Sequence, residues 1–105
     1  GGAQELGETV RETAVREVRE ETGVEIDVTH LIDVVDTITR DKDGRVRLQY
    51  TLVDFAAEWR LGETVAGSDA MGAQWIHPDD LGPLNLWKET LRIIELSRAR
   101  RRETV

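Results

Sequence analysis

The chain has 105 residues, 39% of them hydrophobic, which is sufficient for one globular domain of modest size. It carries 21 acidic and 14 basic residues, and the formal net charge of −7 disfavours a polyanion, so we expect no nucleic-acid partner. No apolar run approaches the roughly 20 residues of a membrane span, and we expect no membrane contact. The lack of cysteine excludes disulfides and thiolate metal sites and suits the cytoplasm, which is the location we expect.

The first third of the chain predicts one amphipathic helix. Thr9-Val-Arg-Glu12 is a capping box, in which the Thr and Glu side chains satisfy each other's backbone N–H groups. The helix is expected to extend to Thr22, with Gly23 as its C-terminal stop. Apolar residues recur every four positions and predict a buried stripe made of Val10, Ala14 and Val18.

The middle of the chain predicts β-strands and a hairpin. Residues 24–29 alternate apolar and polar side chains, and residues 31–39 and 45–57 are rich in β-forming types. Residues 40–44 have the composition of a hairpin turn. Each aromatic residue here is expected to pack in the core, with stacking on a nucleotide base as the less favoured role: Tyr50, Phe55 and Trp59, and later Trp87.

The last third predicts a loop over residues 60–71, a short strand over 73–76 and a second amphipathic helix over about 86–101. Its inward face is expected to hold Trp87, Leu91, Ile93 and Ile94. The arginines at its end are interpreted as a solvated helix terminus that complements the helix dipole. A helix, a long hairpin, a short strand and a final helix give an α+β or α/β/α layered domain.

Three glutamates of the first predicted helix form a candidate chemical site. Glu17, Glu20 and Glu21 stand at i, i+3 and i+4, which places their carboxylates on one face within a single turn. Like charges at this spacing repel one another unless a cation lies between them, and hard ions such as Mg²⁺ or Mn²⁺ prefer oxygen ligands. The competing interpretation is a solvated acidic face, since Glu is a strong helix former and arginines intersperse the acids.

The residues around these glutamates decide between the two interpretations. Residues 2–24 read G-x5-E-x7-R-E-U-x-E-E-x-G-U, where U is a bulky aliphatic residue. This pattern resembles the Nudix box at every defined position. The resemblance implies the Nudix fold, an α/β/α sandwich with a mixed β-sheet in which at least one strand precedes the box. We therefore expect residues 1–105 to form a single Nudix domain that is N-terminally incomplete.

The resemblance also implies roles for the residues of the box. Glu20 and Glu21 resemble the paired carboxylates that ligate divalent cations, and Glu17 resembles a further ligand or a base that activates water. Arg16 resembles the arginine that orients these glutamates. Gly2 is expected to offer its backbone carbonyl to the metal. Glu8 resembles the glutamate that holds the loop–helix–loop together rather than a catalytic group.

Members of the Nudix family often use one more acidic residue from a loop before a late strand. Asp69 lies six residues before Trp75 and is the expected fourth metal ligand or general base. The competing interpretation is a loop Asp that favours a turn. Glu63, in the same predicted loop, is the second choice for this role.

The implied chemistry is Mg²⁺- or Mn²⁺-dependent hydrolysis of a pyrophosphate bond in a nucleoside diphosphate derivative. Residues 36–50 and 53–59 carry a weaker likeness to ADP-ribose pyrophosphatase-type members, which favours an ADP-ribose-like small-molecule substrate. The competing functions are a (d)NTP pyrophosphohydrolase, a nucleotide-binding module without catalysis, and an inactive fragment of an active enzyme. The resemblance also leaves room for a homodimer.

Overall fold

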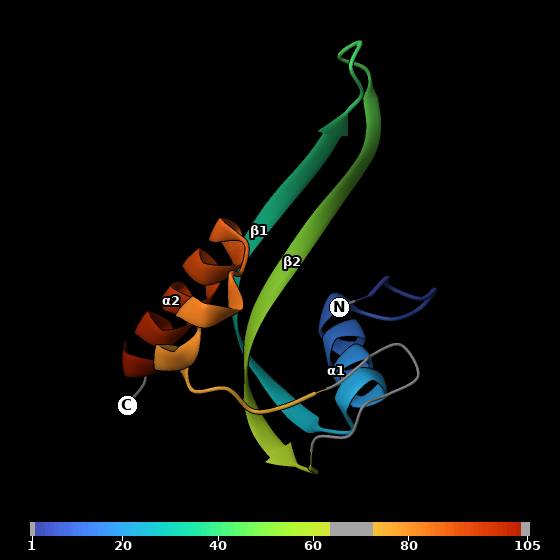
Figure 1. The fold of residues 1–105 in the computed structure, drawn as a ribbon. Helices are drawn as coiled ribbons and strands as arrows, with labels where there is room; N and C mark the ends of the chain where they lie inside the picture. Colours follow the sequence, from blue (N-terminus) through green and yellow to red (C-terminus); the bar gives the residue numbers. More distant parts are fainter. Residues whose placement is uncertain (1, 64–72, 104–105) are drawn as a thin grey trace.

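The computed structural model describes residues 2–63 and 73–103, which form two helices and one hairpin. Helix α1 (Val10–Thr22) is followed by strand β1 (Glu25–Arg40) and strand β2 (Val46–Leu61), then by two short 3₁₀ turns and helix α2 (Lys88–Glu103). The two helices lie on opposite sides of the hairpin, whose tip projects beyond both of them (Figure 1). The α+β class and the layered order helix, sheet, helix are thus confirmed.

Helix α1 begins and ends where the sequence predicts. The hydroxyl of Thr9 accepts a hydrogen bond from the backbone N–H of Glu12 at 3.1 Å, and the Glu12 carboxylate accepts one from the N–H of Thr9 at 3.0 Å. At the other end, Gly23 has φ 79° and its N–H donates to the carbonyl of Arg19. A glycine suits this left-handed cap because it has no Cβ to clash.

Strands β1 and β2 each have 16 residues and pair antiparallel along their whole length. The two strands predicted over residues 24–29 and 31–39 are one strand in the structure. Register irregularities between Val28 and His30 and between Leu31 and Asp33 mark the position where the alternation breaks. A bulge shifts the side-chain alternation by one residue while the strand continues, which explains why the pattern suggested two strands.

The hairpin tip is a turn, as its composition predicts. The carboxylate of Asp41 accepts hydrogen bonds from the backbone N–H groups of Asp43 and Arg45 at 2.9 and 3.0 Å. Gly44 has φ 81°, a conformation that glycine adopts without strain. These contacts close the turn locally, so the tip needs no support from the helices.

The sheet differs from the mixed sheet that the sequence resemblance implies. Within residues 2–63 and 73–103 it has two strands, which are antiparallel to each other. The strand predicted over residues 73–76 is wrong: these residues have no regular secondary structure, and the chain passes into 3₁₀ turns at Pro78–Asp80 and Gly82–Leu84. A short apolar run forms a strand only if a partner strand accepts its hydrogen bonds.

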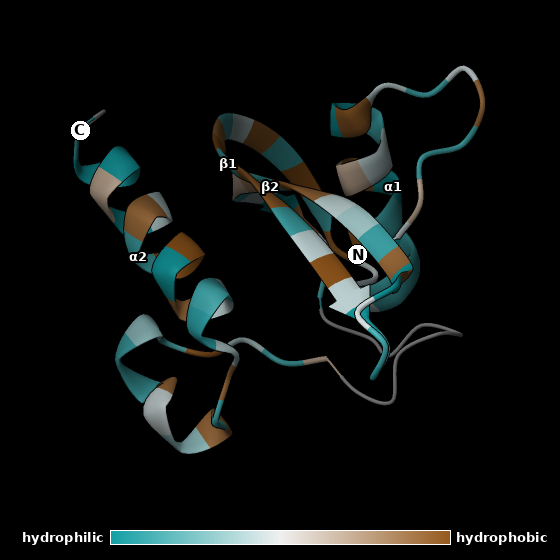
Figure 2. Ribbon diagram, turned by 90° about the horizontal axis from the view of Figure 1, so that it is seen from above, coloured by the Kyte–Doolittle hydropathy of each residue, from teal (hydrophilic) through white to brown (hydrophobic). Residues whose placement is uncertain are grey.

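Few large side chains of the described region are buried. Val24, 2% exposed, is the one buried hydrophobic residue there, and hydrophobic residues occur along both strands (Figure 2). Val10 of the predicted stripe is exposed, whereas Ala14 and Val18 are half-buried. The remaining expectations of core packing fail for the following residues, each more than a third exposed: Tyr50, Trp59, Trp87 and Leu91. Two strands and two flanking helices cover too little area to enclose them.

Candidate active site

The candidate site is built on α1 and on the loop of residues 2–8 that precedes it. The loop folds back onto the helix through Glu8, whose carboxylate accepts hydrogen bonds from the backbone N–H of Glu5 at 3.1 Å and from the Thr13 hydroxyl at 2.7 Å. Gln4 donates to the backbone carbonyl of Glu8. Thr13 is one of the two buried residues of the described region, at 8% exposure. The loop is therefore fixed to the first turns of α1 by polar contacts.

Arg16 is the centre of this arrangement. Its Nε and Nη2 donate to the two carboxylate oxygens of Glu8 at 2.7 and 3.0 Å, a bidentate pair. Nη2 also donates to the backbone carbonyl of Ala3 at 2.9 Å. Nη1 donates to the carboxylates of Glu17 at 2.7 Å and Glu20 at 3.2 Å. One guanidinium thus connects the loop with two of the three predicted site carboxylates.

The electrostatics of the Arg16 and Glu8 pair favour the charged forms of both groups. Hydrogen bonds from Arg16, then from Thr13, lower the pKa of Glu8 from 4.5 to about 2. The carboxylate of Glu8 in turn raises the pKa of Arg16 above its usual range, with Glu17 adding to the effect. Both side chains are less than a fifth exposed, which shields the pair from water more than a surface ion pair.

Gly2 lies directly against Glu17. A Cβ atom built on Gly2 would lie 2.1 Å from Cδ of Glu17 and 2.2 and 2.4 Å from its two carboxylate oxygens. Any side chain at position 2 would therefore displace the Glu17 carboxylate. The backbone of Gly2 therefore lies next to Glu17, the first predicted metal ligand of the helix, although the two residues are 15 positions apart.

The three glutamates differ in their surroundings. Glu17 is largely shielded, with 14% of its side chain exposed, whereas Glu20 is 49% exposed. Glu21 is half-buried on the same helix. Among residues 2–63 and 73–103, no group of three or more acidic or histidine side chains is arranged to enclose a metal ion, and Arg16 contacts both Glu17 and Glu20.

The chemistry of these donors nevertheless fits a hard divalent cation. Carboxylate oxygens on neighbouring turns of a rigid helix, with a backbone approaching one of them, are the ligand types that Mg²⁺ and Mn²⁺ prefer. The arginine beside them compensates part of their mutual repulsion. The sequence-based ligand set of Gly2, Glu17, Glu20 and Glu21 stays a prediction.

Of the two candidates for the additional acidic residue, only Glu63 belongs to the described part of the chain. Asp69 lies outside the described residues, so its role stays a prediction from the sequence. Glu63, the second choice, is exposed and immediately follows Gly62, where a Cβ atom would lie 2.6 Å from the carbonyl oxygen of Gly23. This approach brings the end of β2 to the C-terminal end of α1. The segment that holds Glu63 thus leaves the sheet beside the box.

Two aromatic residues lie next to Glu63. Trp59 and Trp75 line a shallow hollow together with Gly62 and Glu63, and both tryptophans are more than half exposed. The Trp59 Nε1–H donates to the carbonyl of Gly62 at 2.8 Å, which fixes that ring. The sequence indicated base stacking as a less favoured role for Trp59, and it gave no indication of such a role for Trp75. Trp75 follows Trp59 by 16 residues, with a loop between them, so no helix or strand periodicity predicts that the two rings lie together.

Thr13 is a site residue that the sequence reasoning missed. Its one hydroxyl hydrogen is shared between a carboxylate oxygen of Glu8 at 2.7 Å and the backbone carbonyl oxygen of Thr9 at 3.0 Å, which ties the loop to the first turn of the helix. The available signal was its place one turn after the capping Thr9, on the helix side that also carries Arg16 and Glu17. A Thr in a helix interior usually bonds the preceding turn, and the extra bond to Glu8 requires knowledge of the loop's path.

Comparison with known proteins agrees with this local architecture. A family model described as "NUDIX domain" matches residues 1–96. The chain is 36% identical over 81 residues to an uncharacterized Nudix hydrolase, YvcI, of Bacillus subtilis (strain 168), covering 77% of this chain and 51% of that protein. It is 38% identical over 84 residues to an ADP-ribose pyrophosphatase of Methanocaldococcus jannaschii, covering 80% of this chain and 47% of that protein.

The chain spans about half the length of the curated relatives it matches. No helix of the described residues is long and apolar enough to cross a membrane. The family match covers most of the chain and includes the loop, the capped helix and the arginine-centred glutamates described above. The chain belongs to the Nudix family.

Proposed function

We propose that this chain carries out divalent-metal-dependent hydrolysis of a pyrophosphate bond in a nucleoside diphosphate derivative, with an ADP-ribose-like molecule as substrate. The observation that supports this proposal most directly is the convergence of the Glu17 and Glu20 carboxylates on one nitrogen of Arg16, within a complete Nudix box. The similarity to an archaeal protein named ADP-ribose pyrophosphatase supports the substrate class.

In this proposal the chain's own residues divide into ligands and supports. Glu17, Glu20 and Glu21, with the backbone carbonyl of Gly2, would hold Mg²⁺ or Mn²⁺. A metal bound there supplies Lewis-acid polarisation of the phosphoryl oxygens and a more acidic water. Arg16 fixes the rotamers of Glu17 and Glu20 through hydrogen bonds that already exist in the structure.

The remaining requirement is a group that accepts the proton of the attacking water. A carboxylate suits this role, because its ionised form is available at neutral pH. Asp69 is the proposed acceptor or fourth ligand, with Glu17 as the other candidate on the helix. Glu63 replaces Asp69 if the segment after β2 brings it to the substrate instead.

The hollow beside Glu63 offers a place for the base of the substrate. Trp59 and Trp75 present exposed rings there, next to the end of the box at Gly23. Aromatic rings bind nucleobases by stacking, which tolerates different bases. Both residues are therefore proposed to contact the base, and neither to take part in the chemistry.

The test is hydrolysis of ADP-ribose in Mg²⁺, with release of AMP measured by chromatography beside a panel of dNTPs. Wild-type chain should release AMP from ADP-ribose faster than it releases monophosphates from dNTPs, and chelation of the metal should abolish release. Glu20→Gln should lower turnover at least about tenfold, whereas Glu89→Gln, a control on α2, should not. Faster hydrolysis of dNTPs would instead identify a (d)NTP pyrophosphohydrolase.

Binding without turnover would point to a function other than hydrolysis. If ADP-ribose binds but is not hydrolysed, and Glu20→Gln does not alter that binding, the chain is a nucleotide-binding module. If activity appears only in a longer version of the protein, this chain is an inactive fragment of an active enzyme. Either result contradicts the proposed activity of this chain.

A further inference from the structure

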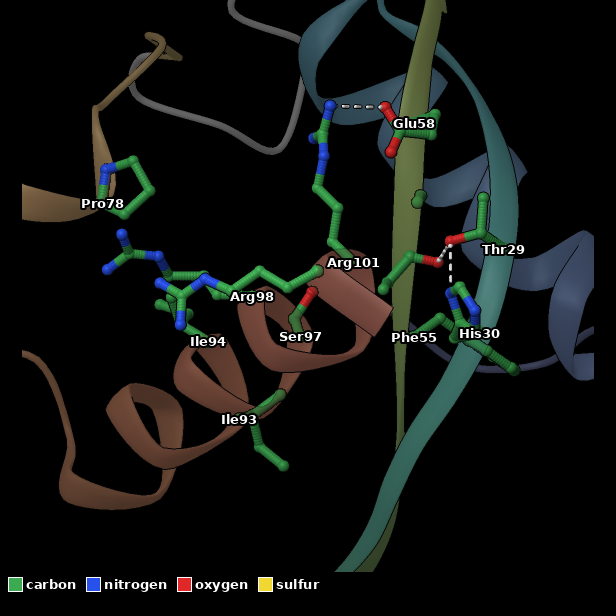
Figure 3. Close-up of a pocket in the computed structure, with 13 residues that line it drawn as sticks. Thr29, His30, Phe55, Glu58, Pro78, Ile93, Ile94, Ser97, Arg98 and Arg101 are labelled. Carbon is green, nitrogen blue, oxygen red and sulfur yellow. Dashed lines mark hydrogen bonds and ion pairs between the residues drawn. The ribbon is translucent and has the colours of Figure 1, made fainter. Parts of the chain in front are cut away.

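A second cavity lies on the side of the hairpin opposite the candidate active site. It has a volume of about 460 Å³, is partly open to solvent and is bordered by α2, the two strands and Pro78 (Figure 3). Helix α1 packs against the other side of the sheet (Figure 1). None of the described box residues lines this cavity, so it is separate from the carboxylates of the candidate active site. A volume of this size is typical of small-molecule sites.

The charge of this cavity is opposite to that of the chain as a whole. Arg98, Arg101 and Arg102 all line it, and Glu58 is the one acidic residue among the described residues of the lining. The described lining residues therefore sum to two positive charges in a chain whose net charge is −7, and Asp79 and Glu95, which pair with Arg98, lie outside that sum. Three arginines on two turns of one helix, all bordering a concave surface, form a local anion-attracting field.

Two of these arginines, Arg98 and Arg101, form ion pairs at long distances. Nη1 of Arg98 lies 3.3 Å from a carboxylate oxygen of Glu95 and 3.6 Å from one of Asp79. Nη2 of Arg101 lies 3.4 Å from a carboxylate oxygen of Glu58 (Figure 3). These acids are between 46% and 70% exposed. Exposed pairs at such distances are weak, so a ligand with more charge and better geometry can replace them.

The rest of the lining combines apolar walls with hydroxyl groups. Pro78, Ala56 and Ile94 supply apolar surface, and Thr29 and Ser97 contribute hydroxyl groups to the lining (Figure 3). The guanidinium group of an arginine can donate two parallel hydrogen bonds to two oxygens of one phosphate group. A phosphate monoester carries about −1.5 to −2 charges at neutral pH, so it competes with the neighbouring acids for the arginines better than a single carboxylate does.

We propose that the cavity between α2 and the hairpin binds a small organic phosphate, with Arg98 and Arg101 on the phosphate and the apolar walls on its organic part. This site is additional to the hydrolytic site proposed for α1. It needs no metal, because arginines supply its positive charge. Its ligand is a phosphate monoester with an apolar or aromatic group, small enough for the cavity volume.

The test is an NMR titration of the whole chain with phenyl phosphate in the presence of a chelator, which keeps the α1 carboxylates metal-free. Amide signals of Thr29, Ala56 and Ser97 should shift saturably, with a dissociation constant on the order of 1 mM. Signals of Gly2 and Glu17 should stay in place. Inorganic phosphate should bind at least about threefold more weakly, because it has no organic part to contact the walls.

Variants on the same helix sharpen the test. Arg98→Gln and Arg101→Gln should each weaken phenyl phosphate binding at least about fivefold. Arg100→Gln is the matched control, since Arg100 belongs to the same helix turn but does not line the cavity. Glu58→Gln removes the acid that pairs with Arg101 and should strengthen binding about threefold, an outcome that misfolding cannot produce.

Three results would overturn the proposal. The first is equal weakening by Arg100→Gln and Arg98→Gln, which would indicate general attraction to a basic helix end. The second is shifts that do not saturate, or that appear at Gly2 and Glu17 instead. The third is equal affinity for inorganic phosphate and phenyl phosphate. Loss of hydrolytic activity at α1 has no bearing on these readouts, so the two proposals fail independently.

Discussion

Glu8 and Arg16 face each other through two parallel hydrogen bonds, from Nε to Oε2 at 2.7 Å and from Nη2 to Oε1 at 3.0 Å. The pair joins the loop before α1 to the middle of that helix. Because the same guanidinium also contacts Glu17 and Glu20, the position of the site carboxylates depends on a glutamate that is not itself a predicted ligand.

The Glu8 carboxylate predicts a specific acid dependence of stability. Its pKa is lowered from 4.5 to about 2 by Arg16 and Thr13, so its stabilising effect is complete above pH 4.5 and is lost as the pH falls towards 2. Glu8→Gln should be less stable than wild type at neutral pH and should lose less stability on acidification through this range. Urea unfolding at a series of pH values measures the difference. Glu103→Gln, at the exposed end of α2, is the control, and a pH profile of Glu8→Gln parallel to wild type would contradict the prediction.

Substituting Arg16 by Lys should separate charge from geometry. A lysine keeps the positive charge but cannot form the bidentate pair with Glu8 and contact Glu17 at the same time. We expect kcat for ADP-ribose to fall roughly 10- to 100-fold, with a smaller change in KM, because the carboxylates lose their fixed rotamers. Arg19→Lys, which affects the exposed pair with Glu25, should leave kcat within about twofold. Equal kcat for both variants would show that Arg16 acts through charge alone.

Gly2→Ala tests the contact between the loop and Glu17. The added Cβ would overlap the Glu17 carboxylate, which is the flexible end of a side chain and can move. We therefore expect a weaker apparent affinity for Mg²⁺ by about tenfold or more in steady-state kinetics. Stability should change by less than about 1 kcal/mol in thermal unfolding. Gly82→Ala is the matched control, since a Cβ there meets nothing within 4 Å. Unchanged Mg²⁺ dependence would remove Gly2 from the site.

Gly62→Ala tests the junction between the end of β2 and the end of α1. Gly62 has φ 101°, and its Cβ would lie 2.6 Å from the Gly23 carbonyl oxygen, a backbone atom that cannot turn aside. Backbone strain and this clash together should lower the free energy of unfolding by about 1–3 kcal/mol. Chemical denaturation measures the loss, with Gly82→Ala again as control. A fully stable Gly62→Ala variant would mean that the two segments do not meet in solution.

Asp69 and Glu63 compete for the role of the additional acid, and paired variants distinguish them. Asp69→Asn should lower turnover of ADP-ribose at least about tenfold if Asp69 is the base or a ligand. Glu63→Gln should then have a small effect. The reverse ranking would assign the role to Glu63, which follows the end of β2 beside Gly23. Single-turnover measurements avoid interference from slow product release.

Local features of the fold were predictable from sequence, and features that depend on distant partners were not. The capping box at Thr9 and the glycine stop at Gly23 act within a few residues, and the structure confirms both helix ends. The continuity of β1 through His30 was not predicted, because a bulge hides the alternation. The strand expected over residues 73–76 failed for a related reason, since strand formation requires a pairing partner that sequence pattern does not reveal.

In the candidate site, too, local features were predictable from the sequence and contacts between distant segments were not. The spacing of Glu17 and Glu20 follows from helix geometry alone, and the resemblance to the box assigned Arg16 as their orienting residue. The contribution of Thr13 and the contact of Gly2 with Glu17 required the path of the loop, which spacing does not determine. Trp59 and Trp75 come together at one hollow from segments far apart in the sequence, so no pattern could pair them.

The contacts of Arg16 have a consequence for the order in which this protein folds. All of them join residues at most 13 positions apart, whereas the strand pairing brings together residues as distant as Glu25 and Leu61. Short loops close faster and lose less chain entropy than long ones. We therefore expect the loop and α1 to acquire their native contacts before the hairpin is complete. Glu17 and Glu20 would then reach their positions on α1 early in folding, and the hairpin would pack against the loop and α1 afterwards.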